Sequence, residues 1–230
     1  MEGVKLACLY TIGCLESRRR ETDKIFSQFI KSPSKSQLPL IVKKLMEFEP
    51  YFFYRLIAEN NNLDSFQPEV VKAYWLGNEL LKEIDERIIK QCFSRVSFTN
   101  PRDLERISKI VGLINRKPHH NFSVIWTLKK NKSLTPIILK KINECLIRSG
   151  VVMKVKRERV IVKTKRISFN ENFYLENSLE ELQKFFLNLK NLKKGDLVSF
   201  HFRKTREKIF PREAENLIKI TKEAISFLEE

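Results

Sequence analysis

Residues 151–166 read VVMKVKRERVIVKTKR, and this stretch decides the fold. Apolar and polar side chains alternate on both sides of Arg157-Glu158, with the period of two that is typical of β-strands. The stretch therefore predicts an antiparallel hairpin with its turn at residues 157–158. Everything before residue 118 has a helical pattern instead, so we expect the strands in the C-terminal half.

The N-terminal half is predicted to be helical. Apolar residues recur there at intervals of three and four, as Ile25, Phe26, Phe29 and Ile30 do, and prolines, glycines and asparagines interrupt the pattern. The predicted helices cover residues 16–31, 51–58, 69–76, 79–93 and 101–116. One more helix is expected after Ser36, which would be its N-cap, and Asn78 is the expected N-cap of the helix 79–93. We expect residues 1–117 to form an α-helical half.

The C-terminal half mixes the two patterns. Besides the hairpin, the predicted strands are 121–126, 173–175 and 197–202. The predicted helices are 135–149, 179–189 and 211–228, and residues 203–210 are expected to be a polar loop. Ser178 and Glu181 resemble a capping box for the helix 179–189. Residues 118–230 therefore form an α+β half with a small, mostly antiparallel sheet and packed helices, and we expect the two halves to make one compact unit.

The chain is strongly basic, with a formal net charge of +16. Such a charge favours polyanionic partners such as nucleic acid, although a solvated surplus of lysine is the alternative. No apolar run approaches the ~18 residues of a membrane span. The N-terminus also lacks the small-residue cleavage site of a signal peptide. We therefore expect a cytoplasmic protein with no membrane span, whose four cysteines are mostly reduced.

Several motifs of known chemistry are absent from the sequence. It contains no Gly-x-Gly-x-x-Gly, no Walker loop, no Gly-x-Ser-x-Gly and no His-Glu-x-x-His. It also contains no Cys-x-x-Cys pair. These absences argue against nucleotide hydrolysis, serine hydrolysis and a cysteine-rich zinc site. Whether the protein is an enzyme stays open.

The three histidines are the best candidates for a polar site. His119 and His120 are adjacent before the predicted strand 121–126, and His201 lies late in the predicted strand 197–202. Imidazole exchanges protons near neutral pH and is the commonest nitrogen ligand of metals in proteins. Three roles are open: a structural one, acid–base chemistry at a small-molecule site, or a divalent metal held by the three histidines. A metal would need a further donor, for which the candidates are Cys14, Cys145, Glu69 and Asp196.

A second candidate surface is the hairpin itself. Its lysines Lys154, Lys156, Lys163 and Lys165 are expected to share one face. A positive ribbon of this kind can lie along phosphates, which makes nucleic acid the competing partner. The ribbon lacks the interleaved aromatic residues of a base-stacking platform.

The chain resembles an uncharacterised bacterial and archaeal protein family. The specific motifs are Ala73-Tyr74-Trp75-Leu76-Gly77-Asn78, of the form AYWxGN, and Pro118-His119-His120-Asn121-Phe122, of the form PHHxF. Weaker matches are residues 50–57, 145–152 and 195–201. The resemblance covers about residue 48 to the C-terminus.

Members of that family are encoded near nickel–iron hydrogenase and hydrogenase-maturation genes. The resemblance therefore implies an accessory or maturation role, with hydrogenase or its maturation proteins as partners. This chain departs from the family at two places: the region after Phe122 reads Ser123-Val124 where a further histidine is usual, and Phe202 replaces a tryptophan.

One site is predicted from these segments together. We expect it to contain Tyr74, Trp75, Asn78, His119, His120 and His201, within about 10 Å of one another. The leading hypothesis is a hydrogenase-linked accessory factor that handles a metal or a small ligand. The alternatives are a basic nucleic-acid-binding protein and an enzyme that uses histidine acid–base chemistry.

Overall fold

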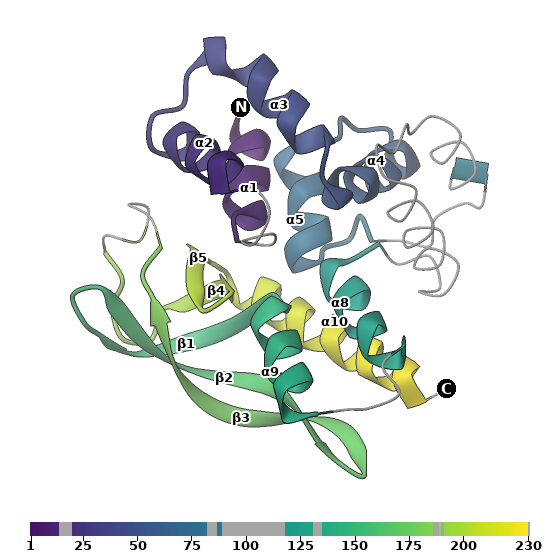
Figure 1. Ribbon diagram of the computed structural model, residues 1–230, viewed down its shortest axis with the longest axis vertical. Helices are drawn as coiled ribbons and strands as arrows, with labels where there is room; N and C mark the ends of the chain where they lie inside the picture. Colours follow the sequence, from purple (N-terminus) through teal and green to yellow (C-terminus); the bar gives the residue numbers. More distant parts are fainter. Residues whose placement is uncertain are drawn as a thin grey trace. The chain divides into compact units, whose positions relative to one another are not determined.

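A computed structural model describes residues 1–13, 20–81, 87–88, 118–130, 135–185, 189 and 191–229 (Figure 1). The fold is α+β, as predicted, with helices before residue 118 and strands in the C-terminal half. The chain divides into two compact units, Met1–His120 and Asn121–Glu230. Among the described residues, no helix is both long enough and apolar enough to cross a bilayer.

The described part of the first unit is helical. Its elements are α1 (Glu2–Thr11), α2 (Arg20–Lys31), the 3-10 helix η1 (Lys35–Gln37), α3 (Leu38–Met46), α4 (Glu49–Asn61) and α5 (Pro68–Leu76). Asn62 ends α4 in the left-handed conformation, and Gly77 ends α5 with φ 79°. Both residue types tolerate positive φ. The predicted end of α5 at residue 76 is confirmed, whereas α4 continues past its predicted end at residue 58.

Two smaller predictions for this unit were wrong. Ser36 lies inside η1, and the N-cap of α3 is Gln37. Glu79 lies in a turn rather than at the start of a helix. The predicted helix 101–116 and most of the predicted helix 79–93 lie outside the described residues.

The strands of the second unit close into a five-stranded barrel. They are β1 (Arg148–Val155), β2 (Arg159–Asn170), β3 (Asn172–Gln183), β4 (Leu197–His201) and β5 (Lys204–Lys208). Their order around the barrel is β1-β2-β3-β5-β4, and every pairing is antiparallel except that of β3 with β5. The predicted hairpin is confirmed as β1–β2, with residues 157–158 between the strands.

The barrel interior is the core of this unit. Inward side chains alternate along the strands, and residues of the β3–β4 connection complete the set: Val152, Val160, Val162, Leu182, Leu189, Leu192, Val198 and Phe200. Three helices accompany the barrel, namely α8 (His120–Lys130), α9 (Pro136–Cys145) and α10 (Pro211–Glu229). Helix α9 packs against β2, and α10 packs against β1, β3 and β4.

The predicted strand 121–126 was wrong, because these residues belong to helix α8. All five residues from Asn121 to Ile125 are buried. This stretch of the helix therefore has no exposed polar face, so its period of 3.6 is hidden in the sequence.

The predicted helix 179–189 was also wrong, since residues through Gln183 belong to β3. Ser178 and Glu181 suggested a capping box, but Glu181 pairs with Lys156 and Arg159, and the neighbouring Glu180 pairs with buried Arg148. Pairing with β2 decides the structure here, and tertiary contacts of this kind routinely override local propensity.

Two boundaries differ as well. Helix α9 ends at Cys145, not at Ser149, and β1 already starts at Arg148. Gly150 lies inside β1, where an added Cβ would come within 3.0 Å of the Val162 Cβ. The predicted loop 203–210 contains β5, whose Thr205 and Arg206 are fully buried.

Candidate metal centre

Asn121 fixes the first turn of α8 to the entry of β1. Its side-chain amide donates to the Ile147 carbonyl at 2.9 Å and accepts from the Ile147 N–H at 2.9 Å. The same nitrogen is 3.0 Å from the Thr221 hydroxyl of α10. Asn121 is fully buried, so these bonds satisfy groups that no water reaches. His120, directly before Asn121, is the first residue of α8.

A backbone hydrogen bond holds the end of α9 beside the β4–β5 turn. The Phe202 N–H donates to the Glu144 carbonyl at 2.8 Å. Cys145 follows Glu144, and His201 precedes Phe202 as the last residue of β4. The bond therefore connects the neighbours of Cys145 and His201 directly.

The β4–β5 turn is strained. Phe202 and Arg203 both have positive φ, 49° and 57°. Two-residue hairpin turns of this type usually contain Asn or Gly, because a Cβ disfavours the left-handed region. Backbone strain of this kind gathers at functional sites, and here it lies directly after His201.

His120, Cys145 and His201 bring three ligand atoms together. The imidazole nitrogens and the thiol sulfur all lie within 4.8 Å of one another. Both histidines are buried, and Cys145 is half-buried. Cys145 was one of the four further donors considered from the sequence. Of the others, Cys14 lies outside the described residues, and the group contains neither Glu69 nor Asp196.

The spacing of these atoms is slightly wider than coordination requires. Zn–N and Zn–S bonds of about 2.1 and 2.3 Å imply ligand atoms about 3.4–3.8 Å apart around a tetrahedral ion. Since 4.8 Å is the upper limit of these separations, the three side chains would close by at most about 1.4 Å around a metal. Three protein donors leave a fourth position open, which is the pattern of catalytic or transfer sites rather than closed structural ones. The cluster could hold a metal ion.

His119 does not belong to this cluster. It is fully buried, and burial, reinforced by the adjacent His120, lowers the pKa of its imidazole to about 3. His119 therefore stays neutral at physiological pH, and adding a proton there would place a charge in the core.

Tyr74 and Trp75 are core residues of the first unit. Trp75 is fully buried, stacks on Tyr10 at 5.4 Å and donates from its indole N–H to the Tyr54 hydroxyl. Tyr74 stacks on Phe53 at 5.3 Å. His120 also adjoins these rings, 4.5 Å from the Trp75 centroid and with its Nδ1 3.4 Å from the Tyr74 hydroxyl.

Asn78 has a local structural role. Its side chain donates to the Glu69 carbonyl at 2.8 Å and accepts from the Leu80 N–H at 2.9 Å, which closes the turn after α5. The structure thus accounts for the AYWxGN segment by packing and turn formation. The sequence-based expectation that Tyr74, Trp75, Asn78 and the three histidines lie within about 10 Å stays a prediction.

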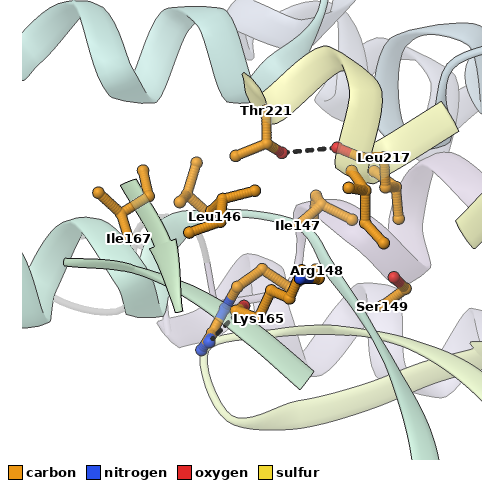
Figure 2. A pocket seen from close by; sticks show the side chains of 10 residues that line it. Leu146, Ile147, Arg148, Ser149, Lys165, Ile167, Leu217 and Thr221 are labelled. Carbon is orange, nitrogen blue, oxygen red and sulfur yellow. Dashed lines mark hydrogen bonds between the residues drawn. The ribbon is translucent and has the colours of Figure 1, made fainter. Parts of the chain in front are cut away.

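A small hollow and an open groove are lined by described residues of the barrel strands and the helices packed on them. The first, shown in Figure 2, has a volume of about 20 Å³ and is lined by residues such as Leu146, Ile147 and Leu217. Thr221 donates there to the Leu217 carbonyl at 2.6 Å. This space holds about one water molecule. The second is an open groove of about 470 Å³ between α9 and the β2–β3 strands, where Arg148 and Glu180 meet.

The lysines of the hairpin differ in their surroundings. Lys156 pairs with Glu181 at 2.5 Å. Lys154, Lys163 and Lys165 have no acidic partner in the part of the chain that the structure describes. Ion pairing therefore removes Lys156 from the predicted positive ribbon and leaves the other three.

A model of a protein family matches most of the chain. The family model described as "Family of unknown function (DUF6390)" matches residues 31–230. The chain belongs to this family. In this DUF6390 chain the match includes His120, Cys145 and His201 together with the whole barrel. No curated protein matches, and no solved structure matches.

Proposed function

We propose that this protein is an accessory factor linked to nickel–iron hydrogenase and that it handles a divalent metal through His120, Cys145 and His201. The observation that carries the proposal is the approach of their three ligand atoms to within 4.8 Å. Each donor comes from a different element: α8, the end of α9, and the end of β4.

The chemistry of the donors favours a metal at the soft end of the divalent series. Imidazole and thiolate together suit zinc, nickel, cobalt and copper, whereas magnesium and calcium prefer oxygen ligands. Among these metals, nickel is the one that the hydrogenase resemblance suggests. An open coordination position is what a metal donor or carrier needs, because the acceptor can bind before the metal leaves.

The neighbouring hydrogen bonds would act as supports for the ligands. Asn121 holds the helix turn that carries His120, and the bond from Phe202 to Glu144 holds His201 beside Cys145. Loss of supporting groups of this kind typically lowers metal affinity by about 10–100-fold.

Metal binding is tested with the full chain after chelator treatment. Co²⁺, Ni²⁺ and Zn²⁺ are titrated in, the bound metal is measured by mass spectrometry, and the thiolate-to-metal charge-transfer band of Co²⁺ and Ni²⁺ is recorded. We expect about one ion per chain. Cys145→Ser should abolish the thiolate band, and His120→Gln or His201→Gln should weaken binding by more than the roughly 10–100-fold of a supporting residue.

His119→Gln is the matched control, because His119 is buried, adjacent to His120 and outside the cluster. It should retain metal and the charge-transfer band. A wild-type chain that binds none of the three metals, or a Cys145→Ser variant that keeps the band, would overturn the proposal.

The hydrogenase link needs a separate test in the source organism. Nickel incorporation into the hydrogenase is measured after deletion of the gene, with the wild-type chain or Cys145→Ser restored. We expect restoration by the wild-type chain only. Unchanged nickel incorporation in the deletion strain would reject the link while leaving metal binding intact.

A further inference from the structure

The outer face of β1, β2 and β3 carries an exposed row of apolar and basic side chains. Val151 on β1 is paired with Lys163 on β2, and Lys163 is paired with Leu179 on β3. Directly paired residues project to the same side of a sheet, so the three side chains lie next to one another. Leu179 is 68% exposed, and Val151 and nearby Met153 are each 38% exposed.

This row is unusual for a solvated sheet face. The inward residues of the same strands already fill the barrel, so the apolar side chains outside it contribute nothing to that core. Apolar side chains gathered on a surface, with polar residues around them, commonly mark a contact site. The positive rim is supplied by Lys154, Lys163 and Lys165, which have no acidic partner among the described residues.

The charge of the chain is concentrated in this unit. Residues 121–230 contain 24 Lys and Arg against 13 Asp and Glu, a net charge of +11 out of +16. The surplus therefore lies mainly on the unit that carries the barrel. The electrostatic field of such a positively charged unit attracts polyanions.

Aromatic side chains occur on the adjoining β2–β3 hairpin. The pairing of β1 with β2 stops at Gly150 and Thr164, and β2 and β3 continue as a two-stranded arm (Figure 1). Near its tip Phe169 and Phe173 lie 4.9 Å apart, and Phe169 is 47% exposed. Tyr174 is 44% exposed. The aromatic residues that seemed absent from the basic ribbon are thus on the arm that extends it.

We propose that the outer face of β1–β3 and the tip of the β2–β3 arm bind single-stranded nucleic acid. Phosphates lie along Lys154, Lys163 and Lys165, while bases contact the apolar row and stack on the arm aromatics. Small five-stranded barrels bind oligonucleotides on the same outer strands, although architecture alone does not assign a function. The unstacked bases of a single strand can contact the apolar row of this face. A duplex keeps its bases inside and would not contact that row.

The test is fluorescence anisotropy of a labelled oligouridine and oligothymidine of about 20 nucleotides, with the metal-free full chain, over a series of salt concentrations. Lys154→Gln/Lys163→Gln/Lys165→Gln should bind at least about tenfold more weakly. Each phosphate contact on a single strand adds about 0.7 to the steepness of the plot of log affinity against log salt concentration. Loss of three contacts should therefore make this slope shallower by about 2. Phe169→Ala/Phe173→Ala should weaken binding by roughly five- to a hundredfold.

The matched control is Lys194→Gln/Lys219→Gln/Lys222→Gln, which removes the same charge from exposed positions of this unit on other elements, the β3–β4 connection and α10. It should keep the affinity within about threefold of wild type, and circular dichroism confirms that each variant folds. Equal losses in both triple variants would show bulk attraction only and overturn the proposal. Absence of binding by the wild-type chain, or tighter binding of a duplex of the same length, would also overturn it.

Discussion

The side chain of Asn121 acts as a strand partner for Ile147, with both of their mutual hydrogen bonds at 2.9 Å. In Asn121→Ala the buried Ile147 N–H and carbonyl would lose their partners. Each unsatisfied buried group costs about 1–3 kcal/mol, so we expect the free energy of unfolding to fall by about 2–5 kcal/mol in urea denaturation. Asn78→Ala, in a half-buried turn, should cost about 1 kcal/mol or less. Similar losses in the two variants would contradict the role of Asn121.

Asn143 repeats this arrangement with Ile167, at 2.8 Å for both bonds. The role of neither asparagine can be predicted from the sequence. A side-chain amide that pairs with a strand backbone, as a neighbouring strand would, leaves no local sequence pattern. Asn121 was part of a motif that carried a family resemblance, yet its role depends on Ile147, which is distant in sequence. The histidines could be named from their chemistry, but the choice of Cys145 as third donor required the fold.

Buried Arg148 and partly buried Glu180 form an ion pair that joins β1 to β3. The guanidinium meets both carboxylate oxygens, at 2.5 and 2.9 Å, and lies 4.7 Å from the Phe200 ring centroid. Arg148→Met leaves the Glu180 carboxylate without its partner, which should cost about 3–5 kcal/mol of unfolding free energy.

The double variant Arg148→Met/Glu180→Leu tests the cause of that loss. Because it removes both charges, its stability should recover to within about 1–2 kcal/mol of wild type in urea denaturation. A double variant as unstable as Arg148→Met alone would indicate that packing of the arginine stem, not its charge, matters at this position.

Gly3 allows α1 to approach the loop before α5. An added Cβ would lie 1.8 Å from the Phe66 carbonyl oxygen, so Gly3→Ala forces the backbone apart. We expect a loss of about 3 kcal/mol or more, measured by chemical denaturation. Gly195→Ala is the control, since no atom lies within 4 Å of its added Cβ and only its φ of 93° is unfavourable. That variant should lose about 1–2 kcal/mol.

Burial raises the pKa of the Cys8 thiol well above its usual range. Above pH 9 the thiol ionises only in the unfolded chain, so the unfolded state releases a proton and stability falls as pH rises. Between pH 8 and pH 10 this thiol should remove about 1.4 kcal/mol of unfolding free energy. The measurement compares wild type with Cys8→Ala at both pH values, and an equal pH dependence of the two would contradict this origin.

The alternating hairpin and the C-terminal ends of α2 and α5 were predictable from the sequence, because those signals are local. The sequence-based prediction misplaced α8 and the end of β3 for opposite reasons: residues 121–125 of α8 are all buried, and the charges of β3 are paired across the sheet. Barrel closure depends on the contact between β1 and β4, which no short stretch of sequence encodes.

X-ray absorption spectroscopy of the metal-loaded chain tests the central claim most directly. For Zn²⁺ or Ni²⁺ we predict a first shell that contains two imidazole nitrogens and one sulfur, with the metal–sulfur distance near 2.3 Å. The sulfur should disappear in Cys145→Ser and persist in His119→Gln. A first shell of oxygen and nitrogen alone in the wild-type chain would contradict a centre built from His120, Cys145 and His201.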